Sequence, residues 1–368
     1  MFARSSEALR QFSPSRVLVP VLLGLGIVGY VMYQELARHE WSVGAWSSRI
    51  PWSPRAFLAL GLGALMLVLR DVGYIWQLRI LTDRKLSWLA CFQVVLLWDF
   101  FAAVSPSIVG GTAVAVFMLC KERLRLGRSA AIVFTTVFLD QMFYISIPLL
   151  VSLIISQGEI FAPLKLIPSD LIGTSLYGAF WSAWAAIAAY VVLLIVALFV
   201  APGWTNHWLT RLLRLPFMER WRMRGLHMAH ELMIASHDLR NRSTGWWLQV
   251  WAATSLAWIG RYLVLNCVLA AFSKVPLGLS DHVLVAGRQA VLWIIMVVSP
   301  TPGSVGVAEM GFSWLFTDLI APGLALTLAL IWRLLSYYPY LLIGIPVMSH
   351  WILRVYGSDV RRIQDANG

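Results

Sequence analysis

The sequence predicts an all-α, polytopic membrane protein that forms a single integral membrane domain over residues 1–368. Hydrophobic residues make up 59% of the chain and charged residues 13%, about half the charged share of a typical soluble domain. The mean hydropathy is +0.73, and 19 Trp and 17 Phe add to the apolar surface. One soluble core cannot hide that much apolar surface while the outside stays polar. The composition therefore excludes an ordinary soluble enzyme.

Ten apolar segments are candidates for membrane segments, because a helix needs about 20 apolar residues to cross the hydrocarbon core. In chain order they are 17–36, 55–81, 87–104, 108–120, 128–156, 171–200, 244–272, 281–300, 303–320 and 323–348. The segments 108–120 and 303–320 are too short or too interrupted to be expected as full crossings. We therefore predict about 8–10 membrane segments.

Basic residues predict the orientation, since Lys and Arg gather in cytoplasmic connections. The connections 79–85 and 121–128 are basic, and the C-terminal tail carries Arg354, Arg361 and Arg362. Both termini are therefore expected in the cytoplasm, in a multi-pass protein of the cytoplasmic (inner) membrane.

The longest connection, 201–243, is predicted to be a basic amphipathic segment on the cytoplasmic side. Phe217, Trp221 and Met228 share one helical face and Arg222 lies opposite, which is typical of a helix on an anionic leaflet. We attribute the formal net charge of +11 to such connections and to anionic headgroups, and we expect no nucleic-acid partner.

One segment is repeated. Residues 93–110, QVVLLWDFFAAVSPSIVG, match residues 289–306, QAVLWIIMVVSPTPGSVG, without a gap. We interpret this match as an internal duplication whose copies cover about 87–156 and 281–348. The first copy enters from the cytoplasm and the second from outside, so inverted repeats are expected, as in many transporters with a site near the membrane midplane. Chance similarity between two apolar stretches is the alternative.

Pro and Gly residues interrupt both copies, in SPSIVGG and SPTPGSVG. The interrupting residues are Pro106, Gly110 and Gly111 in the first copy and Pro302, Gly303 and Gly306 in the second. These motifs cannot form continuous helix, and broken backbone at membrane depth must be buried in protein or line a cavity. A re-entrant hairpin and two full crossings predict the same loop topology. We favour re-entrant hairpins, because 108–120 has too few residues to cross.

Ionisable residues inside apolar segments mark functional pathways or paired polar structure. The candidates for substrate binding, which surround the broken motifs, are Arg70, Asp140, Arg261, Arg288, Glu309 and Arg333. Arginine suits phosphate, because its planar guanidinium makes two-pronged hydrogen bonds and stays charged.

Structural alternatives exist for these charges. Arg70 with Asp71, and Asp140 with Arg333, are expected pairs, and such pairs can be purely structural. Glu309 has three interpretations: a proton carrier, a partner for a cationic headgroup, or a helix cap favoured by the dipole.

No metal or cofactor is expected. Cys91, Cys120 and Cys267 stand singly, without a CxxC pair or a His at metal spacing. No GxxxxGK[ST] nucleotide fingerprint occurs either, so transport would be passive or ion-coupled.

The motifs resemble those of a known family, the membrane domain of lysylphosphatidylglycerol synthetase/flippase proteins, which also occurs as stand-alone flippase-like membrane proteins. The resemblance rests on SPSIVGGTAVAVFML, on the basic KERLRLGRSAAIVFTTVFLDQ that follows, on SPTPGSVGVAE and on IWRLLSYYPYLLIG. It covers roughly 93–148 and 288–345, and the other segments match in hydropathy only.

The second motif is the more specific. The family pattern P-G-G-x-G-x-x-E falls on Pro302, Gly303, Gly306 and Glu309, with Ser304 in place of one Gly.

Three further positions compare with the family. Its late arginine falls on Arg333 and its early acidic position on Asp140. The first hairpin departs, because Thr112 and Ala115 stand where many members carry an acidic residue and an arginine. The resemblance therefore does not carry over the substrate of the better-known members.

The resemblance implies movement of amphipathic lipids between leaflets. We therefore predict a lipid transporter or flippase, not an enzyme, that moves a phospholipid, an aminoacyl-phospholipid or a polyprenyl-phosphate-linked sugar across the cytoplasmic membrane. The aminoacyltransferase domain of many members is not expected here, because the chain ends soon after its last apolar segment. A separate lipid-synthesising enzyme is then an expected partner.

Two alternatives stay open. The first is a membrane-embedded transferase or hydrolase that acts on lipid-linked substrates. It is disfavoured because the external acids and histidines form no DxD or HxxxxD arrangement. The second is an accessory scaffold for a lipid synthase.

Overall fold

The chain is helical in the part that the computed structural model describes, which is residues 26, 29, 30, 33, 50–105, 108–163, 170–212, 239–273, 276–297, 299 and 301–366. No strand occurs among these residues. The predicted all-α class is confirmed.

Among the described residues, six helical stretches are long and apolar enough to cross a membrane. They are α4 (Pro54–Leu81), α7 (Leu126–Ser152), α9 (Asp170–Ile195), α12 (Thr244–Phe272), α13 (Leu279–Val297), and α15 (Ala325–Ser336) together with α16 (Tyr338–Ala366). The protein is therefore a multi-pass membrane protein. Almost all of the expected segment 17–36, and most of the connection 201–243, lie outside the described residues. The described start of that connection is α10 (Pro202–Leu212).

The remaining helices and helical turns are short. They are α5 (Trp88–Val104), α6 (Ile108–Lys121), α8 (Gln157–Ile160), a π-helical turn (Val196–Val200), a 3-10 turn (Pro302–Ser304) and α14 (Val307–Phe316). The expected segment 323–348 is not one helix, because the chain breaks at Tyr337. Pro339 explains the break, since a proline near the start of a helix has no N–H to continue the preceding one.

Serine side chains cap the starts of four of the described helices. The hydroxyl oxygen of Ser53 accepts a hydrogen bond from the Ala56 N–H at 3.2 Å and begins α4, in which Pro54 is the first residue. Ser87 caps α5, Ser156 caps α8 and Ser243 caps α12 in the same way. Each cap satisfies one of the N–H groups that a helix start leaves without a backbone partner.

The helices end within both broken motifs. In the first motif α5 stops at Val104 and α6 begins at Ile108, with Pro106 outside the described residues. In the second motif Gly303 and Gly306 have φ angles of 57° and 85°, a backbone region that favours glycine. Ser304 also has a positive φ, 56°, which agrees with the Gly that the family pattern has at this position. The predicted interruptions are present between α5 and α6 and at residues 302–306. The expectation that Gly110 and Gly111 interrupt the helix is wrong, because both lie inside α6, where helical glycine is unfavourable but tolerated. Re-entry into the membrane and the inverted repeat stay predictions.

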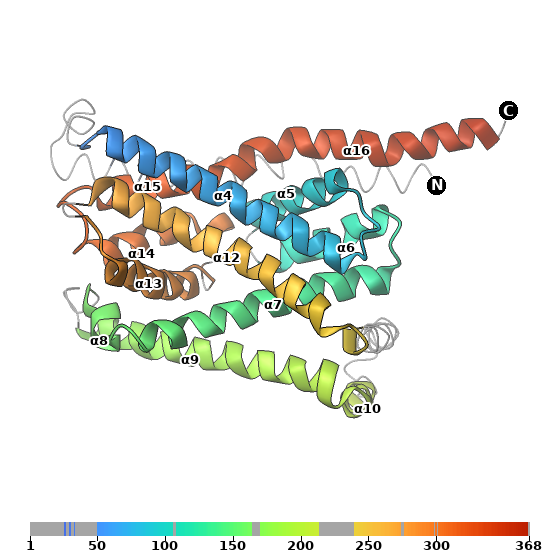
Figure 1. The fold of residues 1–368 in the computed structure, drawn as a ribbon, viewed down its shortest axis with the longest axis horizontal. Coiled ribbons are helices and arrows are strands. Elements are labelled where there is room, and N and C mark those ends of the chain that lie inside the picture. The colour runs from blue at the N-terminus through green and yellow to red at the C-terminus, as the bar shows by residue number, and fades with distance from the viewer. Residues whose placement is uncertain are drawn as a thin grey trace.

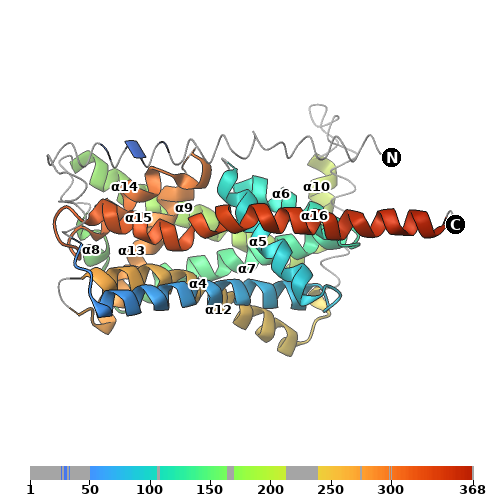
Figure 2. The same cartoon turned by 90° about the horizontal axis from the view of Figure 1, so that it is seen from above.

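The long helices α4 and α12 run side by side along the bundle (Figure 1). The α5–α6 pair lies toward one end of the bundle, and the α13–α14 pair lies toward the other. Figure 2 shows that the C-terminal part of α16 projects beyond the other helices. The two broken motifs therefore approach one another from opposite ends.

The buried apolar side chains form two cores, one around each broken pair of helices. Four long helices, α4, α7, α9 and α12, contribute to both. In α7, Leu139 belongs to the core around α5–α6, and Phe143 belongs to the core around α13–α14. In α12 the same change occurs between Ala253 and Trp258. The middle of the bundle is thus a junction between two packed halves.

Candidate functional site

Two glycines bring α4 and α12 into backbone contact at this junction. A Cβ atom on Gly73 would lie 2.6 Å from the Ala257 nitrogen, and a Cβ atom on Gly260 would lie 2.8 Å from the Arg70 nitrogen. Small residues allow such an approach between membrane helices. The polar and aromatic residues next to these glycines are therefore brought together near the middle of both helices.

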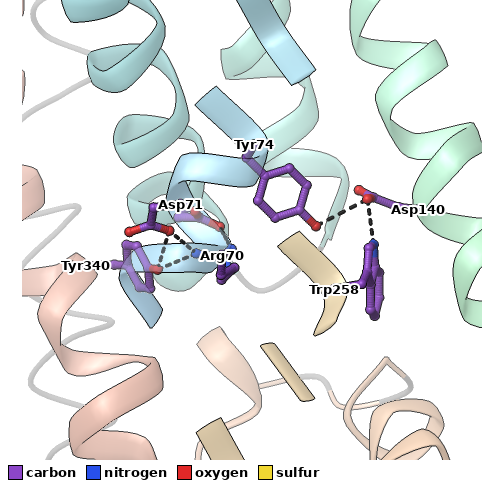
Figure 3. Close-up of polar contacts among 7 residues, drawn as sticks. Arg70, Asp71, Tyr74, Asp140, Trp258 and Tyr340 are labelled. Carbon is purple, nitrogen blue, oxygen red and sulfur yellow. Dashed lines mark hydrogen bonds and ion pairs between the residues drawn. The ribbon is translucent and has the colours of Figure 1, made fainter. Parts of the chain in front are cut away.

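The Arg70 guanidinium is the centre of one polar cluster (Figure 3). It donates hydrogen bonds to Asp71 Oδ1 at 2.8 Å, to Asp99 Oδ1 at 2.7 Å and to the Tyr340 hydroxyl. That hydroxyl in turn donates to Asp71 Oδ1 at 2.7 Å. The expected Arg70–Asp71 pair is confirmed, and Asp99 from α5 gives Arg70 a second carboxylate.

The Asp140 carboxylate accepts hydrogen bonds from two aromatic side chains. The Tyr74 hydroxyl donates to Asp140 Oδ1 at 3.2 Å, and Trp258 Nε1 donates at 2.7 Å. Figure 3 shows these two side chains pointing toward Asp140 from α4 and α12. The expected Asp140–Arg333 pair is wrong, because Arg333 contacts a different carboxylate. Both residues lie within apolar segments, but the position of a residue along such a segment does not show which neighbouring helix it faces.

Arg333 and Glu309 form a buried ion pair, with 3.2 Å between Nε and Oε1. Glu309 also accepts a hydrogen bond from the Gly306 N–H at 2.6 Å. Arg333 donates to the Gly303 carbonyl oxygen at 2.6 Å. Of the three interpretations of Glu309, the structure therefore shows the helix cap, at the start of α14.

Arg288 occupies a separate site that is 2% exposed. Its two terminal nitrogens donate to Asp318 Oδ1 and Oδ2 at 2.6 and 2.8 Å. They also donate to the carbonyl oxygens of Leu315 and Glu159, both at 3.0 Å. These bonds join α13 to the chain after α14 and to α8.

Arg261 on α12 differs from the other predicted arginines. Its guanidinium carbon lies 5.9, 5.1 and 5.2 Å from the ring centres of Tyr74, Trp258 and Trp293. The residue is only partly buried. Within the described part of the chain, no carboxylate or hydrogen-bond acceptor contacts its side chain.

The two broken motifs touch through Tyr337, the residue between α15 and α16. The Tyr337 hydroxyl donates to the Ala103 carbonyl oxygen at 3.1 Å, next to the first break. The Tyr337 ring also packs against Gly303 of the second break, where a Cβ atom would lie 2.2 Å from the ring. The Arg333 guanidinium carbon is 3.9 Å from the centre of the same ring. The breaks therefore meet at the junction.

The site contains residues that the sequence interpretation did not select. Tyr74 and Trp258 stand one helical turn from Arg70 and Arg261, and this spacing was the available signal. Tyr340 and Asp318 follow irregular segments, so no helical periodicity relates them to their partners. Among the described residues, no group of three or more His, Cys, Asp or Glu is placed to hold a metal ion.

Comparisons with known proteins agree with these motifs. The family profile described as "Lysylphosphatidylglycerol synthase TM region" matches residues 17–344. A curated relative, named "UPF0104 membrane protein", from Archaeoglobus fulgidus, is 22% identical over 352 residues, which is 92% of this chain and 97% of the relative. No solved structure matches the chain significantly. The chain belongs to the lysylphosphatidylglycerol synthase transmembrane-region family.

Proposed function

We propose that the protein moves phosphate-bearing amphipathic lipids between the leaflets of the cytoplasmic membrane, as a transporter and not as an enzyme. The observation that carries this proposal is the charged and aromatic network at the middle of α4, α7 and α12. It includes Arg70, Asp140 and Arg261, three of the residues nominated from the sequence. Intramembrane charges are rare, and by default they line a substrate or ion pathway.

The network offers what a headgroup needs on its way through the bilayer. Taking a charged group into hydrocarbon without partners is unfavourable by several kcal/mol or more. Fixed polar side chains at mid-depth replace part of the lost hydration. The lipid tails stay outside in the hydrocarbon, so the protein needs to shelter the headgroup alone.

The division into two apolar cores supports alternating access, in which the polar network opens first to one leaflet and then to the other. Each half packs around its own broken pair of helices, and the polar residues lie where the long helices pass from one half to the other. Rocking of one half against the other would expose the network to one leaflet and then to the other. Transporters built from repeats commonly move in this manner.

Contacts between connections support the proposed orientation, with both termini in the cytoplasm. Arg128 and Arg242, from two different connections, both form ion pairs with Asp83 at 2.8 Å. Three basic connections therefore lie at one end of the bundle, where the positive-inside rule places the cytoplasm. A lipid-synthesising enzyme in the same membrane is the proposed source of the transported lipid.

Reconstitution into liposomes tests the proposal. Phosphatidylglycerol with a fluorescent headgroup-proximal label is placed in both leaflets, and a membrane-impermeant reductant bleaches the outer leaflet. We expect wild-type protein to make the inner-leaflet label accessible, whereas protein-free liposomes keep about half of the signal protected. Mass spectrometry of the same lipids should show no new product. Protected signal in both samples contradicts transport, and a new lipid product favours the transferase or hydrolase alternative.

A further inference from the structure

We infer that Arg261 binds the phosphate group of the transported lipid, and that Arg70, Arg288 and Arg333 are structural. The inference rests on the proposed function and names the headgroup contact within it. It starts from how the protein neutralises its own arginines. Three of the four already contact a carboxylate, and Arg261 forms no ion pair with any described residue.

The three paired arginines are buried, and internal carboxylates already neutralise their charges. Each is 4% exposed or less, and each contacts at least one acidic side chain. Removing one partner of such a pair leaves an uncompensated buried charge. A lipid phosphate would therefore have to displace an internal carboxylate before it could bind Arg70, Arg288 or Arg333.

The described neighbours of the Arg261 guanidinium are aromatic rings and not anions. Aromatic rings from α4, α12 and α13 surround the guanidinium, and the residue is more exposed than the paired arginines. Rings attract a cation, but they provide no acceptor for its five N–H groups. A phosphate supplies two acceptor oxygens in the geometry that a guanidinium prefers.

Asp140 holds two of these rings in place. Tyr74 and Trp258 both donate to its Oδ1 atom, and both rings lie within 6 Å of the Arg261 guanidinium. Neutral donors therefore hydrogen-bond the carboxylate, and Arg261, whose charge acts on Asp140 only through space, keeps its N–H groups for an anion from outside. The same chemistry fits a lipid phosphodiester and a free phosphate, and the two sources need separate measurements.

Ligand-induced stabilisation of the purified full chain in neutral detergent tests the inference. The probes are short-chain phosphatidylglycerol, short-chain diacylglycerol, which lacks phosphate, and inorganic phosphate. The midpoint of thermal unfolding is recorded against probe concentration for wild type, Arg261→Gln, Arg261→Lys and Arg55→Gln. Arg55 is an exposed arginine at the start of α4, so its variant controls for the loss of one positive charge.

We expect phosphatidylglycerol, and not diacylglycerol, to raise the midpoint of wild type and Arg55→Gln. Arg261→Gln should weaken the apparent affinity about tenfold or more, because charge-assisted hydrogen bonds are lost. Arg261→Lys should retain part of it. Equal affinity in wild type and Arg261→Gln overturns the inference. If Arg261→Gln does not fold, two other results overturn the inference. One is an affinity of Arg261→Lys equal to that of wild type, and the other is a diacylglycerol shift as large as the phosphatidylglycerol shift.

Two further outcomes separate the possible conclusions. An Arg261-dependent shift with inorganic phosphate as strong as that with phosphatidylglycerol contradicts a lipid ligand and indicates a free-phosphate site. Phosphatidylglycerol binding without transbilayer movement keeps the Arg261 site and rejects transport. Transbilayer movement at the wild-type rate in Arg261→Gln liposomes keeps transport and rejects the site.

Discussion

At the scale of single residues, the arginines within the apolar segments share a chemistry but not a role. The sequence showed that these arginines were unusual, but it could not separate those with a structural role from one that binds a ligand. The division depends on partners that lie far away along the chain, such as Asp318 for Arg288 and Asp99 for Arg70. Those contacts arise from helix packing, so depth in the membrane could not predict them. The same limit explains why Asp140 was assigned to the wrong arginine.

The Glu309–Arg333 pair gives a stability prediction at this scale. Arg333→Met should lower the thermal unfolding midpoint in detergent, because it leaves the Glu309 carboxylate buried without its counter-charge. Such losses are typically about 3–5 kcal/mol. The double variant Glu309→Gln/Arg333→Met should recover part of the loss, since both charges are then gone. The single variant Glu309→Gln completes the comparison. A loss in the double variant as large as the losses in Glu309→Gln and Arg333→Met added together would show that the pair is not coupled.

At the scale of helices, the sequence predicted most of the segments because long apolar runs are strong signals. The five segments 55–81, 128–156, 171–200, 244–272 and 281–300 correspond to long helices. The break at Tyr337 was missed, because the run 323–348 stays apolar through it. The Pro and Gly motifs were informative, since residues that cannot continue a helix mark its end wherever it packs.

The contact between α4 and α12 gives a prediction about glycine. Gly73→Ala should lower the unfolding midpoint and weaken phosphatidylglycerol binding, because the new methyl group would meet the Ala257 backbone at 2.6 Å. Gly61→Ala on the same helix is the matched control, because no atom lies within 4 Å of its added Cβ. That variant should keep or raise the midpoint, as alanine favours helix over glycine by about 1 kcal/mol. Equal midpoints for the two variants would contradict the close approach.

At the scale of the whole molecule, two apolar halves meet at a polar junction, and each half holds one broken pair of helices. The sequence predicted the two broken motifs, because the repeat and its Pro and Gly residues are visible along the chain. It could not predict that Tyr337 joins them. That contact links Ala103 to the second break over more than half of the chain.

The Tyr337 link gives a prediction for the assembled molecule. Tyr337→Phe should lower the unfolding midpoint, because the buried Ala103 carbonyl oxygen loses its donor, at a cost of about 1–3 kcal/mol. Tyr338→Phe is the matched control, since the Tyr338 hydroxyl has no hydrogen-bond partner among the residues that the structure describes. The control should leave the midpoint nearly unchanged. Identical behaviour of the two variants would show that the link does not hold the halves together.

The central claim is that a lipid phosphate crosses the membrane past Arg261. The most direct measurement is the initial rate of phosphatidylglycerol movement between leaflets in liposomes that contain equal amounts of wild type, Arg261→Gln or Arg55→Gln. The account predicts rapid movement with wild type and Arg55→Gln. With Arg261→Gln it predicts at most about one tenth of the wild-type rate. Equal rates for all three proteins would contradict it.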